Sequence, residues 1–145
     1  MKRLMILLAA TSCSASCFAK DPGWSESRWR TFLDALRQTE TSAEPNNGLG
    51  ATGDNGNAIG PYQIWEIYYQ DAKDYDKSIN FPYTDCLNDK AKSEKVIKAY
   101  IKRYLPENGT MEDAARIHNG GPNGYKKKST LGYLKKFVGF LKSLV

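Results

Sequence analysis

The stretch SESRWRTFLDALRQTET, residues 25–41, decides the fold of this chain. Its large apolar residues stand at the i, i+3, i+4 and i+7 positions of one helical stripe: Trp29, Phe32, Leu33 and Leu36. This spacing predicts an amphipathic helix packed on a core. Glu40 comes eleven residues after Trp29, and eleven steps of about 100° return to within about 20° of the same direction. Glu40 is therefore predicted to point inward, unless the helix has already frayed at Thr39 and leaves Glu40 exposed.

A carboxyl group on an apolar helix face loses hydration in its charged form, so burial favours the protonated acid. A protonated carboxyl near neutral pH is what a general acid requires. Glu40 is thus the first candidate catalytic residue.

The segment that follows, residues 44–61, is rich in Gly and Asn and has no helical stripe, which predicts loops and a hairpin. Asp54 precedes Asn55 and Gly56 within it. A turn aspartate commonly hydrogen-bonds its own turn backbone, so this position alone favours a structural role. The glycines do not form a phosphate-binding loop, because no Gly-Lys-Ser/Thr ending follows them.

Four further helices are predicted downstream. The first covers residues 61–75, with Pro61 in its first turn and an inward stripe of Trp65, Tyr68, Ala72 and Tyr75. The second covers residues 87–104 and buries Val96, Ile97, Tyr100, Ile101 and Tyr104. The third starts at a near capping box of Thr110 and Asp113 and ends at His118. The last starts after Ser129 or Thr130 and buries Leu134, Phe137, Val138, Leu141 and Leu144.

The chain has 145 residues, enough for one globular domain. Lys2 and Arg3 precede an apolar run, residues 4–10, that is too short to span a bilayer. This pattern predicts a secretory signal peptide cleaved after Ala19, with a mature domain at residues 20–145. Lipidation is disfavoured, because Ala10 and Ser14 stand where an aliphatic residue would precede each candidate cysteine.

Cleavage leaves Cys86 as the single cysteine, which excludes a disulfide framework and a zinc site built on paired cysteines. A buried, small apolar role is predicted for it, with an intermolecular disulfide as the alternative. His118 has no metal-ligand partners at suitable spacing, and a satisfied histidine at a helix C-terminus is its default interpretation.

Charge is divided unevenly along the mature chain. Residues 20–89 carry 6 basic and 12 acidic side chains, whereas residues 90–145 carry 13 basic and 4 acidic ones. A basic second half suits an anionic polymer, either nucleic acid or a bacterial wall. The alternative is a set of solvated lysines on helix faces, as for Lys92, Lys95, Lys98 and Lys102.

Taken together, these blocks resemble the invertebrate-type lysozyme family, also called the destabilase family. The most specific are Gly60-Pro61-Tyr62-Gln63-Ile64, the run from Ala115 to Pro122, and Ser129-Thr130-Leu131-Gly132-Tyr133. In that family the glutamate at the end of the first helix is the acid and the aspartate of the following hairpin is the second carboxylate. The resemblance places these roles on Glu40 and Asp54.

The resemblance implies a mainly helical α+β, lysozyme-like fold and an exported enzyme, secreted or periplasmic. Its reaction would be hydrolysis of the β-1,4 bond between N-acetylmuramic acid and N-acetylglucosamine in peptidoglycan, without metal or cofactor. Chitooligosaccharides are a second candidate substrate, and no nucleic acid partner, no membrane insertion after signal cleavage and a monomer are expected. The predicted substrate-binding residues are Tyr62, Gln63, Tyr68, His118 and Asn119.

Two departures from the family pattern stand out. The family is usually rich in disulfides, so this chain would belong to a cysteine-poor branch, and its export signal has a bacterial character. Some relatives also cleave isopeptide bonds with a serine near the hairpin, but Asn57, Ala58 and Ile59 offer no hydroxyl there, and Trp65 replaces a frequent lysine. Isopeptidase activity is not expected. Two alternatives to hydrolysis stay open: a lytic transglycosylase, and a wall-binding or regulatory protein that lost activity.

Overall fold

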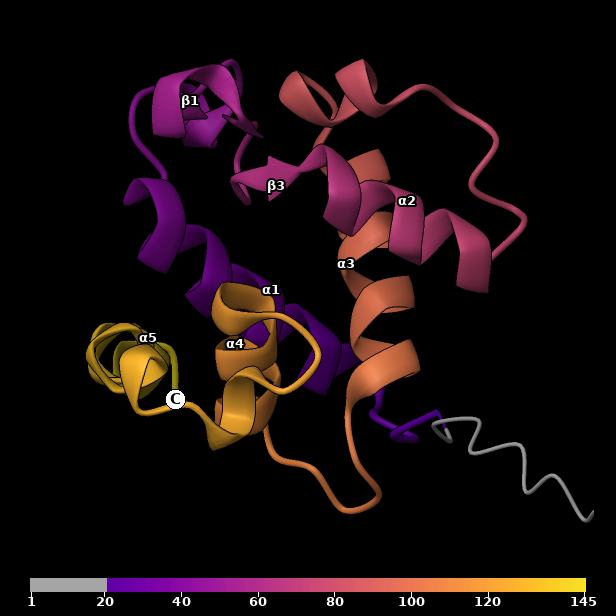
Figure 1. Ribbon diagram of the computed structural model, residues 1–145. Helices are drawn as coiled ribbons and strands as arrows, with labels where there is room; N and C mark the ends of the chain where they lie inside the picture. Colours follow the sequence, from indigo (N-terminus) through magenta and orange to yellow (C-terminus); the bar gives the residue numbers. More distant parts are fainter. Residues whose placement is uncertain (1–20) are drawn as a thin grey trace, which may run out of the picture.

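Helix α1, Glu26–Thr41, crosses the middle of the molecule (Figure 1). The structure, a computed structural model, describes residues 21–145, so the predicted signal peptide at residues 1–19 lies outside the described residues. Ser25 caps α1 by accepting a hydrogen bond from the backbone N–H of Arg28 at 3.2 Å. The predicted apolar stripe is buried. Because α1 continues to Thr41, Glu40 still lies in the helix, and the frayed alternative is wrong.

A small antiparallel sheet lies beyond the C-terminal end of α1 (Figure 1). Its strands are β1 (Thr52–Gly53), β2 (Ala58–Ile59) and β3 (Ile64–Trp65), in the order β1-β2-β3. One helical turn, η2 (Asp54–Gly56), connects the first two strands, and another, η1 (Asn46–Gly48), precedes them. The predicted hairpin is therefore present.

Helix α2, Glu66–Tyr75, starts five residues later than the predicted helix. Pro61 instead occupies the second position of a turn in which the N–H of Gln63 donates to the carbonyl of Gly60 at 3.1 Å. Proline with its fixed φ suits this turn position as well as the first turn of a helix, so the sequence signal was ambiguous. The inward orientation predicted for Trp65 and Tyr75 is wrong, since both are exposed.

Three more helices complete the fold. Helix α3 (Lys90–Tyr104) follows a short turn, η3 (Tyr83–Leu87), and begins after Asp89, whose side chain caps it. Helix α4 (Met111–Gly120) has the predicted capping box at Thr110 and ends two residues later than expected, where Gly121 adopts a φ of +81°. Helix α5 (Leu131–Ser143) follows the turns η4 (Gly124–Lys126) and η5 (Lys128–Thr130).

The core joins the apolar faces of all five helices to the inner side of the sheet. Helix α1 packs against α5, and α2 packs against α3. Phe137 of α5 is fully buried as predicted, whereas Leu144 lies beyond the end of α5 and is 46% exposed, so its predicted burial is wrong. Cys86 is free and buried, as expected of a small apolar residue. The prediction of a mainly helical α+β fold is confirmed.

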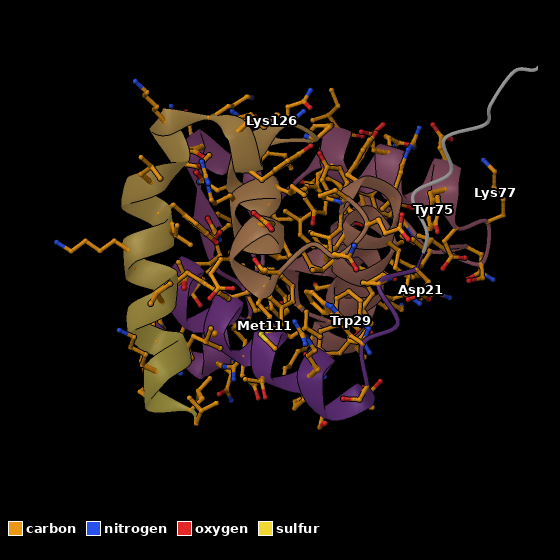
Figure 2. The ribbon with its side chains drawn as sticks, turned by 90° about the horizontal axis from the view of Figure 1, so that it is seen from below. Asp21, Trp29, Tyr75, Lys77, Met111 and Lys126 are labelled. Atoms are coloured by element: carbon orange, nitrogen blue, oxygen red, sulfur yellow. The ribbon has the colours of Figure 1, made fainter. Side chains whose placement is uncertain are left out.

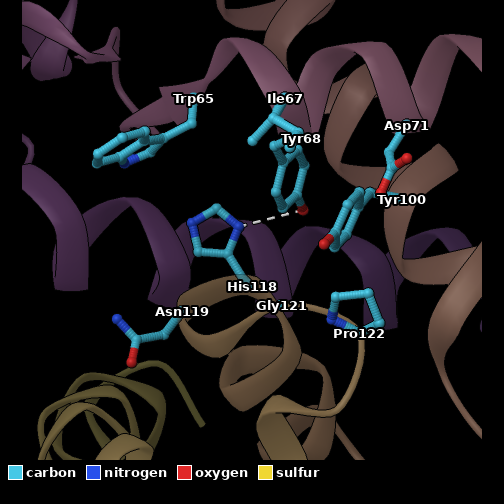
Figure 3. Close-up of a pocket in the computed structure, with 9 residues that line it drawn as sticks. All are labelled: Trp65, Ile67, Tyr68, Asp71, Tyr100, His118, Asn119, Gly121 and Pro122. Atoms are coloured by element: carbon cyan, nitrogen blue, oxygen red, sulfur yellow. Dashed lines mark hydrogen bonds between the residues drawn. The ribbon is translucent and has the colours of Figure 1, made fainter.

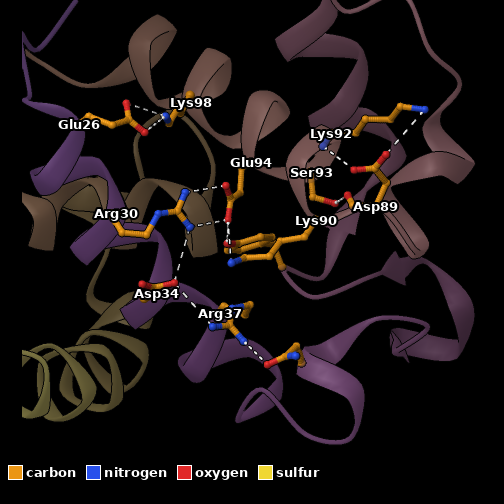
Figure 4. A network of polar contacts seen from close by, with 12 residues as sticks. Glu26, Arg30, Asp34, Arg37, Asp89, Lys90, Lys92, Ser93, Glu94 and Lys98 are labelled. Carbon is orange, nitrogen blue, oxygen red and sulfur yellow. Dashed lines mark hydrogen bonds and ion pairs between the residues drawn. The ribbon is translucent and has the colours of Figure 1, made fainter.

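A network of charged side chains connects α1 to α3 (Figure 4). The guanidinium of Arg30 donates two hydrogen bonds to the carboxylate of Glu94, at 2.8 and 2.7 Å. Burial alone would raise the pKa of Glu94, but hydrogen bonds from Arg30 and Tyr62 outweigh it and hold this pKa below its usual value. Within residues 21–145, no helix is both long and apolar enough to cross a membrane.

Candidate active site

A cleft of about 370 Å³ opens between the end of α1, the sheet and the end of α4. Its lining brings together residues from four separate segments: Glu40, Gly53, Asp54, Ala58, Gln63, Trp65, His118 and Asn119. Both predicted catalytic carboxylates thus face one cavity, although they come from a helix end and a hairpin turn. The two residues share this cavity because Glu40 lies at the end of α1, and the chain that follows folds back in the hairpin that carries Asp54.

Glu40 lies at the inner end of this cleft, with 15% of its side chain exposed. Its Oε1 atom accepts a hydrogen bond of 2.5 Å from the hydroxyl of Tyr133 on α5. The same oxygen lies 3.1 Å from Nε2 of His118 on α4. Both of these contacts involve Oε1, and within residues 21–145 no hydrogen bond or ion pair is formed by Oε2, which can therefore engage another group.

His118 is almost fully buried, with 4% of its side chain exposed. Its Nδ1 atom lies 3.2 Å from the hydroxyl of Tyr68 (Figure 3). The ring of Tyr68 is stacked on that of Tyr100, with centroids 3.6 Å apart. The histidine is therefore held on both ring nitrogens, one toward Glu40 and the other toward the aromatic wall of α2 and α3.

Both tyrosines of this network remain protonated over the whole physiological range. Burial first, and then the neighbouring charge of Glu40, raise the pKa of Tyr133 well above its usual value. Burial likewise raises the pKa of Tyr68 well above its usual value, with smaller contributions from Tyr100 and Glu40. A tyrosine held in its neutral form keeps a hydroxyl hydrogen to donate.

Asp54 lies in very different surroundings. It is exposed, it opens the turn η2, and its backbone has a φ of +47°. Its backbone carbonyl accepts a hydrogen bond of 2.9 Å from the side chain of Asn57, and Asp54 is one of the residues that line the cleft. The sequence favoured a hydrogen bond between the Asp54 side chain and its own turn. In the structure the backbone carbonyl of Asp54 forms the hydrogen bond within the turn instead, which leaves the carboxylate available. One cavity therefore holds a shielded carboxyl and a solvated one.

Four of the five predicted substrate-binding residues lie around the cleft. Gln63, His118 and Asn119 line it, and Tyr68 lines an adjoining pocket. Tyr62 does not, because it is completely buried and its hydroxyl donates to Oε1 of Glu94 at 2.7 Å. The prediction that Tyr62 forms part of the cleft wall is wrong. A tyrosine hydroxyl can hydrogen-bond a sugar, but it can equally donate a hydrogen bond to a buried carboxylate, as that of Tyr62 does.

Sequence reasoning missed two residues of this site. Tyr133 stood in a recognised block without an assigned role, although it lies four residues before the buried Phe137 and hence on the inner face of α5. Trp65 was assigned to the core, yet it is 45% exposed and lines the cleft. Within the described part of the chain, no three His, Cys, Asp or Glu side chains gather in a way that could hold a metal ion.

Comparison with known proteins agrees with this arrangement. A family profile described as Destabilase matches residues 30–139. A lysozyme of Magallana gigas is 39% identical over 82 residues, which cover 54% of this chain and 57% of the oyster protein. Invertebrate-type lysozyme 6 of Caenorhabditis elegans is 32% identical over 111 residues, which cover 70% of this chain and 78% of the nematode protein. The chain thus spans little more than half the length of the oyster relative.

The fold has a solved counterpart as well. The crystal structure of the Tapes japonica lysozyme superposes with a TM-score of 0.60 and 28% identity. The superposition covers 74% of this chain and 86% of that protein. The expected lysozyme-like fold is confirmed.

Proposed function

Because the chain belongs to the destabilase family of invertebrate-type lysozymes, we propose that it is a lysozyme-type glycoside hydrolase acting on bacterial peptidoglycan. Its relatives named as lysozymes support this activity. The bond proposed for cleavage is the β-1,4 linkage between N-acetylmuramic acid and N-acetylglucosamine. The proposal rests above all on one observation, that Glu40 and Asp54 line the same cleft in unlike surroundings.

Such a pair suits glycoside hydrolysis because the two carboxyl groups must differ in protonation. One must be a neutral acid that protonates the leaving oxygen, and the other an ionised group that stabilises or traps the positively charged sugar carbon. Glu40, shielded between Tyr133 and His118, is proposed as the acid. Asp54, exposed to solvent, is proposed as the ionised partner.

The hydrogen bonds of Glu40 support Oε2 as the oxygen that carries the proton in this proposal. Tyr133 donates to Oε1, so this oxygen serves as an acceptor. The hydroxyl of Tyr68 lies 3.2 Å from Nδ1 of His118, and we propose the tautomer in which this hydroxyl donates to Nδ1. A neutral His118 that accepts on Nδ1 carries its hydrogen on Nε2 and donates it to Oε1 of Glu40.

Oε1 then accepts two hydrogen bonds, and the acidic proton of Glu40 resides on Oε2. When Oε2 transfers this proton to the glycosidic oxygen, the new carboxylate keeps both donors on Oε1. Hydrogen bonds to a charged acceptor are stronger than those to a neutral one. Tyr133 and His118 therefore stabilise the product of proton transfer more than the starting acid, which lowers the barrier.

The remaining features of the proposal concern where the enzyme acts. Peptidoglycan is the proposed partner, with chitooligosaccharides as a second substrate, and the predicted signal at residues 1–19 would export the mature chain out of the cell or into a periplasm.

Absence of isopeptidase activity stays a prediction. It is supported by the cleft lining, where the residues found carry no hydroxyl or thiol nucleophile.

Two substitutions test the assignment. Glu40→Gln keeps the shape but removes the donated proton, so lysis of purified peptidoglycan should fall by at least about 100-fold with the melting temperature unchanged. Asp54→Asn should also abolish most hydrolysis. Retention of more than about a tenth of the wild-type rate by Glu40→Gln would refute its role as the acid.

The products decide between hydrolysis and its alternatives. A hydrolase releases reducing muramic ends, whereas a lytic transglycosylase releases anhydromuramic ends and needs no second carboxylate. Anhydro products, together with full activity of Asp54→Asn, would overturn the hydrolase. Failure of the folded wild-type protein to reduce the turbidity of purified peptidoglycan would point to a wall-binding homologue that lacks activity.

A further inference from the structure

Helix α1 ends one residue after the proposed acid, and the way the chain leaves it is unusual. Its last turn holds no basic side chain, although cations stabilise the C-terminal end of a helix. Ser42 and Ala43, which follow the helix, both adopt a φ of 55°. Residues other than glycine rarely occupy this left-handed region. The chain therefore leaves α1 through a tight turn directly after Glu40 and Thr41.

This turn leaves one carbonyl of α1 without its helical donor. In an α-helix the carbonyl of residue i accepts the N–H of residue i+4, and that of Gln38 still accepts the N–H of Ser42 at 2.9 Å. The carbonyl of Thr39 would need the N–H of Ala43, but this N–H donates to Oγ1 of Thr41 at 3.3 Å. Thr39 is only 2% exposed, and a buried carbonyl without a partner is costly.

Lys136 of α5 supplies the missing donor. Its Nζ atom donates to the carbonyl of Thr39 at 2.6 Å, across 97 residues of sequence. A hydrogen bond from an ammonium is stronger than one from a neutral amide, and the positive charge lies at the end of α1 where the helix dipole favours it. Lys136 takes part in none of the ion pairs found in residues 21–145, so this contact engages its charge with the backbone of α1 instead of a carboxylate.

The same face of α5 also binds the side chain of the proposed acid. Helix α5 packs against α1 (Figure 1), and Tyr133, three residues before Lys136, donates its hydroxyl hydrogen to Oε1 of Glu40. The carbonyl of Thr39 and the N–H of Glu40 belong to one planar peptide group. Lys136 therefore fixes the plane from which the backbone of Glu40 continues, while Tyr133 fixes one of its carboxyl oxygens.

We propose that Lys136 is a positioning residue for Glu40, which acts by binding the carbonyl of Thr39 and so fixing the peptide group that carries the acid. The inference rests on the proposed glycoside hydrolase function and adds a residue that does not itself line the cleft. Proton transfer depends steeply on such positioning, since a displacement of about 1 Å can reduce the rate on the order of 100-fold. Substrate binding depends on it less, because most of the cleft lining comes from the hairpin, β3 and the end of α4.

The first test measures kcat and KM on glycan strands from which the peptides have been removed. Lys136→Met keeps the length of the side chain but loses the ammonium, so kcat should fall about tenfold while KM stays within about twofold of the wild type. Lys136→Arg keeps a donor and should restore kcat to within about threefold of the wild type. A role in stability alone would lower the melting temperature without separating kcat from KM.

Lys95→Met provides the matched control. Nζ of Lys95 also donates to a backbone carbonyl, that of Ser78 at 2.8 Å, but Lys95 belongs to α3 and does not line the cleft. This variant should match the wild type in both constants. The proposal is overturned if Lys136→Met keeps kcat within about twofold of the wild type, if Lys95→Met loses as much, or if Lys136→Arg restores nothing.

Amide hydrogen exchange tests the contact separately from catalysis. The N–H groups of residues 39–42 close the last turn of α1, so their exchange should accelerate at least about tenfold in Lys136→Met and stay unchanged in Lys95→Met. Equal exchange in the wild type and Lys136→Met overturns the proposal, whatever the activity. If the wild type proves inactive while exchange accelerates as expected, the hydrolase function fails, and the role of Lys136 in fixing the end of α1 is still supported.

Discussion

Tyr133→Phe isolates one hydrogen bond of the proposed acid. The substitution removes the hydroxyl that donates to Oε1 of Glu40 at 2.5 Å and leaves the half-buried ring in place. A hydrogen bond to a neutral partner contributes about 0.5–1.5 kcal/mol, and one to a charged partner about 1.5–3 kcal/mol. Glu40 changes from neutral to charged as it gives up its proton. The difference, about 1–1.5 kcal/mol, should appear in the barrier and reduce kcat about 5- to 13-fold.

The pH dependence gives a further check. The pKa of Tyr133 lies well above its usual value, first because of burial and then because of Glu40. Tyr133 is therefore neutral throughout the range in which a lysozyme would be assayed and contributes no titration of its own. The loss of kcat in Tyr133→Phe at the pH optimum, measured by turbidity of purified peptidoglycan, should therefore not arise from titration of Tyr133 itself.

Tyr62→Phe provides the matched control. Tyr62 also donates to a carboxylate, at 2.7 Å, and is itself fully buried, but its partner Glu94 belongs to the network between α1 and α3. Tyr62→Phe should lower the melting temperature and keep kcat within about twofold of the wild type. If Tyr133→Phe retained the wild-type kcat, or if both variants lost it equally, the hydrogen bond to Glu40 would have no special part in proton transfer.

Two other predictions concern the stability of the fold and the electrostatic attraction of the protein to a bacterial cell wall. The pKa of Glu94 is lower in the folded protein than in the unfolded chain, so ionised Glu94 stabilises the fold fully above its unfolded pKa, and this contribution is lost as the pH falls through its folded pKa. The difference in melting temperature between the wild type and Glu94→Gln should therefore be largest at neutral pH and should vanish in acid. An equal difference at all pH values would contradict this. Residues 114–145 carry seven basic and no acidic side chains, and Lys135 and Lys142 form none of the ion pairs found in residues 21–145. Figure 2 shows nitrogen-tipped side chains of α5 directed away from the molecule. The rate of whole-cell lysis should fall as added salt shortens the screening length below about 10 Å, and the Lys135→Gln/Lys142→Gln variant should depend less on salt. The rate of cleavage of a neutral chitooligosaccharide should not change with salt. Equal salt sensitivity on both substrates would refute electrostatic attraction.

The structure divides the basic half of the chain into two groups. Lysines of α3 are largely paired: Lys92 with Asp85, Lys98 with Glu26 and Lys102 with Asp21. The sequence allows an interpretation of these residues as solvated lysines on helix faces, and the structure adds a carboxylate partner for each of the three. Exposed side-chain pairs of this kind contribute little to stability and leave little net charge for a distant polymer. The attraction predicted from composition is therefore expected mainly from the region of α4 and α5.

Local sequence patterns predicted the first half of the site well. The periodicity of α1 placed Glu40 on its inner face, and the glycine-rich segment placed Asp54 in a hairpin turn. Both inferences depend on neighbours only a few residues away, where helical geometry and turn chemistry are decisive. The capping box at Thr110 was predictable for the same reason.

Contacts distant in sequence were beyond such reasoning. Tyr133 meets Glu40 across 93 residues, and His118 meets Tyr68 across 50. Periodicity predicts that each side chain points toward the core, but it does not say which partner it finds there. The same limit explains the error at Tyr62, whose buried partner Glu94 lies on a helix 32 residues away.

A chain with no disulfide in residues 21–145 must hold the Asp54 side of the cleft by other means. The backbone N–H of Gly50 donates to the carbonyl of Leu87 at 2.8 Å, and the hydroxyl of Tyr83 donates to the carbonyl of Ile64 at 2.8 Å. These bonds connect the sheet to the turn η3 and so to α3. They supply the fixed geometry that a cross-link would otherwise supply, at a smaller contribution per bond.

Close backbone contact at Gly60 completes this connection. Gly60 has a φ of +73°, and a Cβ atom there would lie 1.9 Å from the carbonyl oxygen of Cys86. Only glycine lets β2 approach η3 so closely, because the obstructing atom is backbone and has little freedom to move. Since Asp54 follows β1, and β1 is paired to β2, the position of its carboxylate relative to Glu40 depends on this contact far from the cleft.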